Sequence, residues 1–371
     1  MKKKVNNYLL IYLLVLLFFS YFFLFIKHQV GNDSTISEWL INYEGGFTKR
    51  GIIGQIAIEI TRIFNIELRQ TIFLLQSLSC TLYFYLLFKF LRDFELKRIL
   101  SLSIFTPIFI LYPIAEIEVL ARKEIIIFSL FLLYLFIPKI NNLIRSFSLI
   151  IFTLLSILIW EPIIFFFPLL LFFEIVERRI KKFDLDFLKI ILSFVPSLII
   201  ASVFVFNPLT LNEHEAMAEI LKNEFGEKCY MSCGLLKTKS TILQQFQGNL
   251  GKYTFEIIIR YIIIIILGFL PLLILFKYSS LKNKNLLFFK SLKNELSIFY
   301  ISLLPVILLF AMGYDWGRWV NISYVMLFLT YMSLLSKKEL ILDNEKLEKN
   351  FFIRIKKSFF IVIFIFYCFG W

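Results

Sequence analysis

Histidine and cysteine, on which most zinc and thiol chemistry depends, are scarce in this sequence. Its 371 residues include two His and four Cys, with no HExxH helix and no Cys/His cluster of the kind that holds zinc. The GxxxxGK[ST] phosphate loop, the GxGxxG dinucleotide motif and a serine-nucleophile motif are also missing. These absences disfavour zinc enzymes, cytoplasmic nucleotide enzymes and serine hydrolases. We expect no cofactor, although the carboxylates present are suitable ligands for a hard divalent cation.

Charge is also sparse, and its placement indicates the class of protein. Charged residues make up 18% of the chain and apolar residues 59%, above the roughly 45–50% of soluble domains. The net charge of +13 comes largely from short Lys/Arg clusters between long apolar blocks, which is the positive-inside pattern. The sequence therefore predicts a polytopic membrane protein surrounded by lipid, and it disfavours nucleic acid as a partner.

The apolar blocks predict about eleven spans, measured against the roughly 20 residues that a spanning helix needs. The expected spans are residues 8–27, 70–90, 99–114, 124–138, 147–160, 162–176, 187–206, 254–276, 296–313, 320–335 and 358–371. The pair 147–160 and 162–176 also reads as one long tilted span, which would invert everything after it. The first block is too long for a signal sequence and lacks a cleavage site, so we expect it to stay attached.

Lys/Arg placement orients this all-α transmembrane bundle with its N-terminus in the cytoplasm. The expected inner segments are Met1–Asn7, Arg92–Arg98, Lys139–Arg145, Glu177–Lys189, Lys277–Glu295 and Ser336–Lys357. The expected outer segments are less densely basic: Lys27–Arg69, Ala115–Lys123, the corner at residues 160–162, Asn207–Tyr253 and Tyr314–Trp319. Splitting 147–176 into two spans keeps the last two basic segments inside, which favours the split.

The outer segments hold most of the tightly turning backbone, because eleven of the 13 glycines lie in or beside them. Within the first outer loop, residues 28–69, the stretch 52–69 mixes apolar and polar residues at near-helical spacing. This pattern predicts an amphipathic helix along the membrane interface. We treat residues 1–371 as a single integral membrane domain.

A longer outer loop is expected at residues 207–253. It predicts a helix at Glu213–Phe225, followed by Cys229 and Cys233. These two are the only plausible disulfide pair, since the other two cysteines, Cys80 and Cys368, fall in apolar spans.

Acidic residues on the outer side are the first candidates for catalysis, because an ionisable group at membrane depth is costly. Glu44 lies in a stretch with four glycines, and Glu116 and Glu118 alternate with apolar residues so that both can point one way. Glu161 either caps a helix start before a proline or binds substrate. Two further acids, Asp33 and Glu38, are expected to be solvated loop residues.

Cations on the outer side break the positive-inside bias: Lys49, Arg50, Arg122, Lys123 and Arg318. A lipid phosphate or pyrophosphate near the outer leaflet would account for all of them. For Arg122 and Lys123, an ion network with the adjacent glutamate at the head of the fourth span is the alternative.

The stretch Tyr314–Trp319 packs an acid, an arginine, a glycine and two tryptophans between two spans. Trp316 and Trp319 suit the aromatic belt at a membrane interface, and Asp315 and Arg318 can pair. The same residues also suit a sugar- or phosphate-binding corner, with Asp315 as a candidate catalytic acid.

In layout the chain resembles the membrane glycosyltransferases of the GT-C superfamily, which use lipid-linked sugars. The shared features are an acid after the first span (Glu44 or Asp33), an interfacial helix (52–69), a second acidic site (Glu116 or Glu118) and the long loop 207–253. The resemblance covers residues 1–276, without the family's Asp-rich first-loop motif. Gly45–Gly51 and Asp315–Trp319 are also similar to GGF-x-[RK]-R-G and D-x-GRW stretches in bacterial membrane proteins of surface-polysaccharide loci.

These features together favour an inverting glycosyltransferase of the bacterial inner membrane, active on the extracytoplasmic face. It would take a polyprenyl-phosphate-linked sugar donor and a glycan or lipid acceptor. Glu44, or else Glu116 or Glu118, would accept the proton of the acceptor hydroxyl. The outer cations would stabilise the departing phosphate, and the two tryptophans would stack on sugar or prenyl chain.

Two alternatives stay open. One is an O-antigen or capsule-type polysaccharide polymerase, which would differ in making long repeats. The other is a non-enzymatic transporter of lipid-linked glycans, which would place ionisable groups within its spans. Few such groups are present, because the charges gather at one face.

Overall fold

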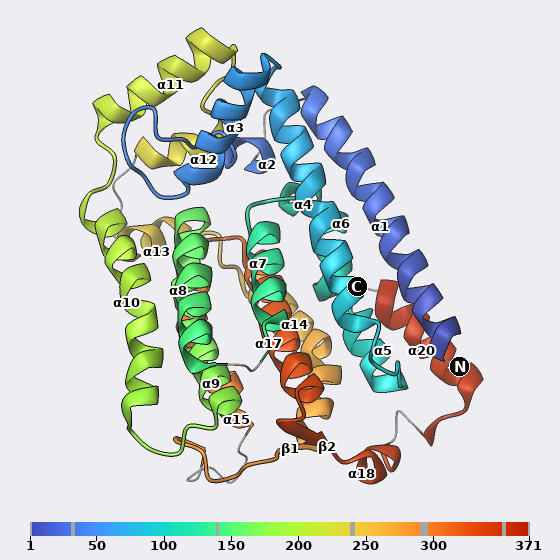
Figure 1. Ribbon diagram of the computed structural model, residues 1–371. Helices are drawn as coiled ribbons and strands as arrows, with labels where there is room; N and C mark the ends of the chain where they lie inside the picture. Colours follow the sequence, from blue (N-terminus) through green and yellow to red (C-terminus); the bar gives the residue numbers. More distant parts are fainter. Residues whose placement is uncertain are drawn as a thin grey trace. The chain divides into compact units, whose positions relative to one another are not determined.

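A computed structural model describes residues 2–30, 34–138, 141–237, 242–289, 296–350 and 354–369. Helix accounts for 76% of the structure. Within the described residues the only strands are β1 (Ser279–Leu281) and β2 (Leu340–Leu342), which pair antiparallel. The expected all-α class is therefore confirmed (Figure 1).

Contacts group the chain into two compact units. The first comprises Met1–Asp93, Pro113–Ile164 and Leu192–Ser240, and the second Phe94–Tyr112, Phe165–Ile191 and Thr241–Trp371. Three elements are divided between them: α6 (Tyr112–Ala115), the 3-10 helix η3 (Glu161–Phe166) and α10 (Leu185–Phe206).

The first unit is built around α4 (Leu68–Leu91), which packs against α1, α3 and α7. Its other elements are α1 (Lys2–Val30), α2 (Ser34–Ser37), α3 (Gly51–Phe64), η2 (Ile117–Val119), α7 (Glu124–Phe136), α8 (Asn142–Ile159), α11 (Leu211–Phe225), α12 (Met231–Gly234) and η4 (Leu235–Lys237). Figure 1 shows α1 and α4 side by side along most of their length.

The burial pattern of α1 explains how a helix apolar on every side takes one orientation. Leu9, Leu13, Leu16 and Leu24 are buried at spacings of three, four or eight residues, so they form one stripe facing α4. Phe18 is 65% exposed on the opposite side. Such an apolar surface is typical of a helix that faces lipid.

The amphipathic helix expected at residues 52–69 is present as α3, although it ends at Phe64 and α4 begins at Leu68. The helix stops at Asn65, which takes the left-handed conformation with φ of 52°. The buried face of α3 consists mainly of residues with small side chains. A Cβ added at Gly54 would lie 2.0 Å from the carbonyl oxygen of Ile41. Glycine at this position therefore lets α3 lie directly on the preceding backbone.

Among the described residues, seven helices are long and apolar enough to cross a membrane. They are Asn7–Gln29, Leu68–Leu91, Arg98–Ala115, Asn142–Ile159, Leu185–Phe206, Phe255–Lys277 and Trp316–Ser336. This supports a multi-pass membrane protein, but eleven full-length spans are not confirmed in the part of the chain that the structure describes.

The remaining expected spans are shorter or interrupted. Residues 124–138 form a 13-residue helix, α7. Residues 147–176 do not form one continuous helix, because α8 ends at Ile159 and η3 separates it from α9 (Phe167–Arg178). Expected span 296–313 is divided among three short helices. Expected span 358–371 is the 13-residue α20, and its last two residues lie outside the described part of the chain.

The second unit is organised around α17 (Trp316–Ser336), which is buried along most of its length. Asn321 donates hydrogen bonds to the carbonyl oxygens of Ile108 (2.7 Å) and Phe109 (2.8 Å), which satisfies backbone groups in the π-helix η1. Its other elements are α5 (Arg98–Ile104), η1 (Pro107–Leu111), α9, α13 (Ile242–Leu250), α14 (Phe255–Lys277), α15 (Ser297–Ile301), η5 (Leu304–Val306), α16 (Ile307–Met312), α18 (Asn344–Glu348) and α20 (Lys357–Phe369).

The helix expected at Glu213–Phe225 is confirmed as α11. Thr210 and Glu213 form a capping box at its start, and Gly226 ends it in the left-handed conformation. The expected disulfide between Cys229 and Cys233 is also present.

Candidate functional site

The turn Asn42–Arg50 leads into α3 and packs against α11. The Gly46 N–H donates to the carbonyl of Tyr43 (3.0 Å), and the Asn42 side chain accepts from the Glu44 N–H (2.9 Å). A Cβ on Gly45 would lie 1.9 Å from the carbonyl oxygen of Glu213. The paired glycines are therefore required for close packing of this turn on α11.

Arg50 ends this turn and is held through both its side chain and its backbone. Its Nε and Nη2 donate to the two carboxylate oxygens of Glu161 (2.7 and 2.9 Å). Its carbonyl accepts a hydrogen bond from the ammonium of Lys123, a residue with no exposed surface. Such a bidentate guanidinium–carboxylate pair fixes both distance and orientation.

Glu38 joins the other cations to this pair. Its carboxylate, 1% exposed, lies 3.6 Å from a guanidinium nitrogen of Arg50 and 3.4 Å from one of Arg122. Lys49 lies 3.7 Å from Glu161 and is the most exposed member, with 43% of its side chain accessible. We call these six residues the Arg50 cluster: Glu38, Lys49, Arg50, Arg122, Lys123 and Glu161.

The environment lowers the pKa values of two members, which disfavours the charged form of Lys123 and favours the charged form of Glu161. Burial lowers the pKa of Lys123 to about 7, because desolvation and the neighbouring Arg50 charge outweigh the attraction of Glu38, Glu161 and Glu124. Burial tends to raise the pKa of Glu161, but the charges of Arg50 and Lys49 and the Arg50 hydrogen bond hold it at about 2. Glu161 is thus fully ionised while Lys123 is close to its titration point at neutral pH.

Glu44 lies outside the Arg50 cluster, in a second network. It accepts hydrogen bonds from Arg62 (2.8 Å) and Gln55 (2.8 Å), and Arg62 also donates to Glu224 of α11 (2.7 Å). The Arg62 hydrogen bond, opposed by partial burial, lowers the pKa of Glu44. Glu44 therefore takes part in tying α3 to α11.

Glu116 and Glu118, the other candidate acids of the outer side, lie at the start and in the middle of η2. Both are exposed, and Glu118 pairs with Lys27 near the end of α1 (2.5 Å). Asp33, the alternative acid of the first loop, lies outside the described residues.

In the second unit, Asp315 and Arg318 pair as expected, with a distance of 3.4 Å between their charged atoms. The guanidinium of Arg318 is nearly buried and lies over the Trp319 ring. The Trp316 indole donates to the Phe310 carbonyl (2.8 Å). Both tryptophans therefore help to build the corner between α16 and α17.

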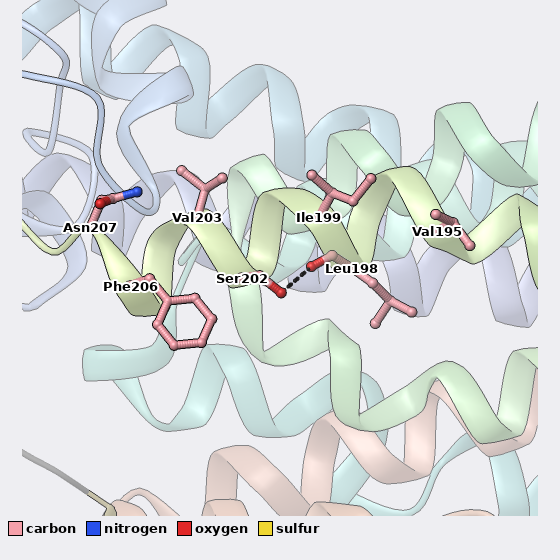
Figure 2. A pocket seen from close by; sticks show the side chains of 7 residues that line it. All are labelled: Val195, Leu198, Ile199, Ser202, Val203, Phe206 and Asn207. Atoms are coloured by element: carbon pink, nitrogen blue, oxygen red, sulfur yellow. Dashed lines mark hydrogen bonds between the residues drawn. The ribbon is translucent and has the colours of Figure 1, made fainter.

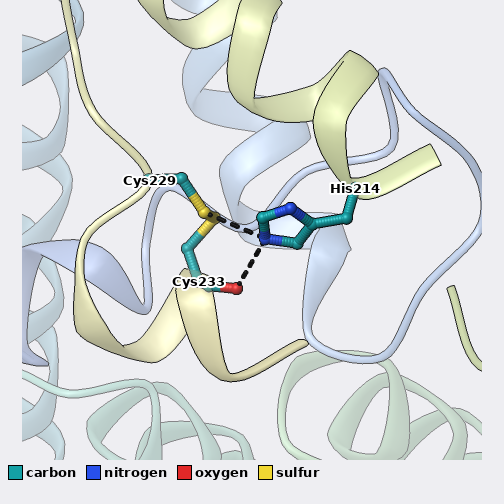
Figure 3. A group of neighbouring side chains, drawn as sticks. All are labelled: His214, Cys229 and Cys233. Atoms are coloured by element: carbon teal, nitrogen blue, oxygen red, sulfur yellow. Dashed lines mark hydrogen bonds between the residues drawn. A yellow bond between two sulfur atoms is a disulfide. The ribbon is translucent and has the colours of Figure 1, made fainter. Parts of the chain in front are cut away.

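A third polar group consists of His214, Cys229 and Cys233 (Figure 3). The His214 Nε2 lies 3.3 Å from the Cys229 sulfur and 3.1 Å from the Cys233 carbonyl oxygen. With the two sulfurs bonded to each other, this group has no thiolate to offer a metal.

A shallow groove of about 350 Å³ runs along α10 (Figure 2). Its lining is largely apolar: Val195, Leu198, Ile199, Ser202, Val203, Phe206 and Asn207. The one hydroxyl there, on Ser202, donates to the Leu198 carbonyl. No ionisable side chain lines this groove, so it is not a centre for acid–base chemistry.

Sequence reasoning misjudged Glu38, which was expected to be solvated. The residue is buried because Ile36, Trp39 and Leu40 beside it belong to a core with α3, α4 and α11. Those apolar neighbours were the available signal. The sequence did identify five of the members as candidate binding residues: Lys49, Arg50, Arg122, Lys123 and Glu161. The structure places these five residues in one cluster.

No family model, curated protein or solved structure matches this chain, so the site rests on its own geometry.

Proposed function

We propose that the protein is a membrane glycosyltransferase that takes a polyprenyl-phosphate-linked sugar on the extracytoplasmic face, with the Arg50 cluster as its phosphate site. The observation that carries this proposal is the convergence of Lys49, Arg50 and Glu161 from segments more than 100 residues apart. Four cations and two carboxylates are concentrated here, in a chain only 18% charged. The four cations outnumber the two carboxylates that they pair with, and an anionic ligand would balance this excess of positive charge.

Lys49 and Arg50 suit a phosphate group chemically. Lys49 is partly exposed and supplies a mobile point charge, whereas Arg50 supplies a planar fork that binds two oxygens at once. An incoming phosphate would compete with Glu161 for that fork. Preorganised cations of this kind stabilise the negative charge that grows on a departing phosphate.

The same exchange provides a general base. Arg50 holds the pKa of Glu161 low only while the two remain paired. Once phosphate occupies the guanidinium, the Glu161 carboxylate gains basicity and can accept the proton of the acceptor hydroxyl. Glu44 is the second candidate for this role, although its Arg62 partner disfavours it.

The test uses a strain lacking the gene, complemented with single variants, and compares its surface glycans. Glu161→Gln and Arg50→Lys are expected to remove the product, because the first loses the base and the second loses the bidentate fork. Lys49→Ala, at an exposed side chain, should weaken binding of a polyprenyl monophosphate more than binding of the uncharged polyprenol. Glu59→Gln, on the exposed side of α3, serves as the matched control.

Membrane abundance of each variant separates loss of function from loss of folding. Unchanged surface glycans in the deletion strain would contradict a role in glycan synthesis. Full product from Glu161→Gln together with unaltered lipid-phosphate binding by Lys49→Ala would contradict the assignment of the site.

A further inference from the structure

The Cys229–Cys233 disulfide closes a very short segment, with a sequence separation of four. A crosslink reduces the conformational entropy of the unfolded chain by a smaller amount when the loop that it closes is shorter. This bond therefore contributes less to stability than a crosslink between distant segments would. Its position beside a buried histidine points to chemistry at the sulfurs themselves.

Contacts other than the disulfide hold the surrounding turn in place. Arg69 of α4 donates to both carboxylate oxygens of Glu227 (2.6 Å each) and to the Tyr230 hydroxyl (2.9 Å). The Ser232 N–H donates to the Ser37 hydroxyl (3.0 Å). None of these bonds involves a sulfur atom, so the reduced turn is expected to keep its shape.

The three candidate ligand atoms are already close together. The His214 Nε2 and the two sulfurs lie within 4.8 Å of one another, a separation compatible with zinc bonds of about 2.0–2.3 Å. His214 is 1% exposed and Cys233 is 0% exposed. Figure 3 shows the imidazole of α11 pointing directly at the disulfide.

We propose that His214, Cys229 and Cys233 form a thiol-gated metal site. The closed disulfide excludes metal, whereas the reduced pair and the imidazole bind one zinc-type divalent cation, with water in the fourth position. This proposal does not depend on the glycosyltransferase assignment.

The gating step balances with a dithiol as reductant. One thiolate of the dithiol attacks a disulfide sulfur to give a mixed disulfide, and its second thiolate then releases the protein thiol. Two electrons and two protons pass to Cys229 and Cys233, and the dithiol becomes a disulfide. Metal binding afterwards releases both thiol protons, because only thiolates ligate.

The imidazole must bind as the neutral ring through Nε2, which moves its proton to Nδ1. The Nδ1 atom is buried and makes no hydrogen bond to the described residues. The proton can therefore transfer there without breaking an existing contact, and the Nε2 contact with the Cys233 carbonyl is exchanged for a bond to the metal.

The experiment uses full-length protein in detergent, reduced with a phosphine that binds metal weakly, and Co²⁺ as the optical probe. The expected result is a near-ultraviolet thiolate-to-cobalt absorption band at one ion per chain, absent from the oxidised protein. His214→Ala should weaken Co²⁺ binding by at least about tenfold, the loss that even an outer-shell partner of a metal ligand causes.

The Cys229→Ser/Cys233→Ser double variant is the matched control, since it retains the buried thiols Cys80 and Cys368. Helical circular dichroism verifies that each variant is folded. Three outcomes would overturn the proposal: a disulfide that resists the phosphine in folded protein, equal Co²⁺ binding by the reduced protein and the double variant, or undiminished affinity in His214→Ala.

Discussion

Arg50 combines an unfavourable backbone conformation with a charged side chain that the cluster requires. Its φ of 64° places a long, charged, non-glycine residue in the left-handed region at the start of α3, a conformation that costs about 1–3 kcal/mol. The Glu161 pair and the Lys123 hydrogen bond offset that cost by fixing the guanidinium and the carbonyl separately. Glycine would relieve the strain at this position, but it would remove the cation.

Lys123 should make the stability of the fold depend on pH. Its pKa is lowered from 10.5 to about 7 in the folded protein, so between these values the unfolded chain binds a proton that the folded chain does not. Stability from this group must then rise with pH across that interval and fall as pH drops through the folded pKa. The thermal midpoint of wild type, relative to that of Lys123→Met, is expected to rise between about pH 7 and about pH 10.

Lys346→Met, at a side chain with 74% exposure, provides the comparison and should follow wild type at every pH. Parallel curves for wild type and Lys123→Met would show that Lys123 keeps an ordinary ammonium in the folded protein.

At the scale of elements, α3 depends on close backbone contact. Gly54 approaches the carbonyl oxygens of both Ile41 and Trp39, which would lie 2.0 and 2.7 Å from an added Cβ. These are backbone atoms of a buried segment next to Glu38, so they cannot move aside as a flexible side chain would. The position of α3 therefore helps to fix the position of the Arg50 cluster.

Gly54→Ala is expected to destabilise the protein by about 1–3 kcal/mol through overpacking, despite the better helix propensity of alanine. Gly248→Ala on α13 is the matched control, since no atom lies within 4 Å of an added Cβ there. That variant should be neutral or stabilising by up to about 1 kcal/mol. Thermal unfolding in detergent measures both, and equal midpoints for the two variants would contradict the close contact.

At the scale of the whole molecule, the sequence places the 28–69 and 207–253 segments on one side of the membrane and 336–357 on the other. The Arg62 bond to Glu224 joins the first two segments, which agrees with their shared side. The inner assignment of 336–357 depends on its Lys/Arg content.

Single cysteines at two exposed positions can determine this orientation in intact cells. Glu224→Cys is expected to react with an impermeant maleimide from outside, whereas Lys346→Cys should react only after the membrane is permeabilised. Both side chains are accessible, at 42% and 74% exposure. Wild-type protein controls for background labelling of the native thiols. Labelling of Lys346→Cys in intact cells would contradict the proposed topology.

The short helices show why eleven full-length spans are not confirmed among the described residues. Hydropathy reports that residues 124–138, 162–176 and 296–313 are apolar, but it does not report whether a helix continues through them. Pro162 and Pro305 lie where helices are interrupted, and a proline disrupts the hydrogen-bond ladder of a helix interior. Apolar content was therefore predictable, while helix length was not.

The sequence by itself determined the helical membrane class, the amphipathic α3, helix α11, the disulfide and the cations of the Arg50 cluster. These follow from periodicity, spacing and the cost of misplaced charge, which act over short stretches of chain. Only the tertiary structure decided that Glu38 is buried, that Glu44 forms an ion pair with Arg62, and that Glu161 forms an ion pair with Arg50. Those pairings join segments distant in sequence, and they depend on how the apolar core around Trp39 brings the segments together.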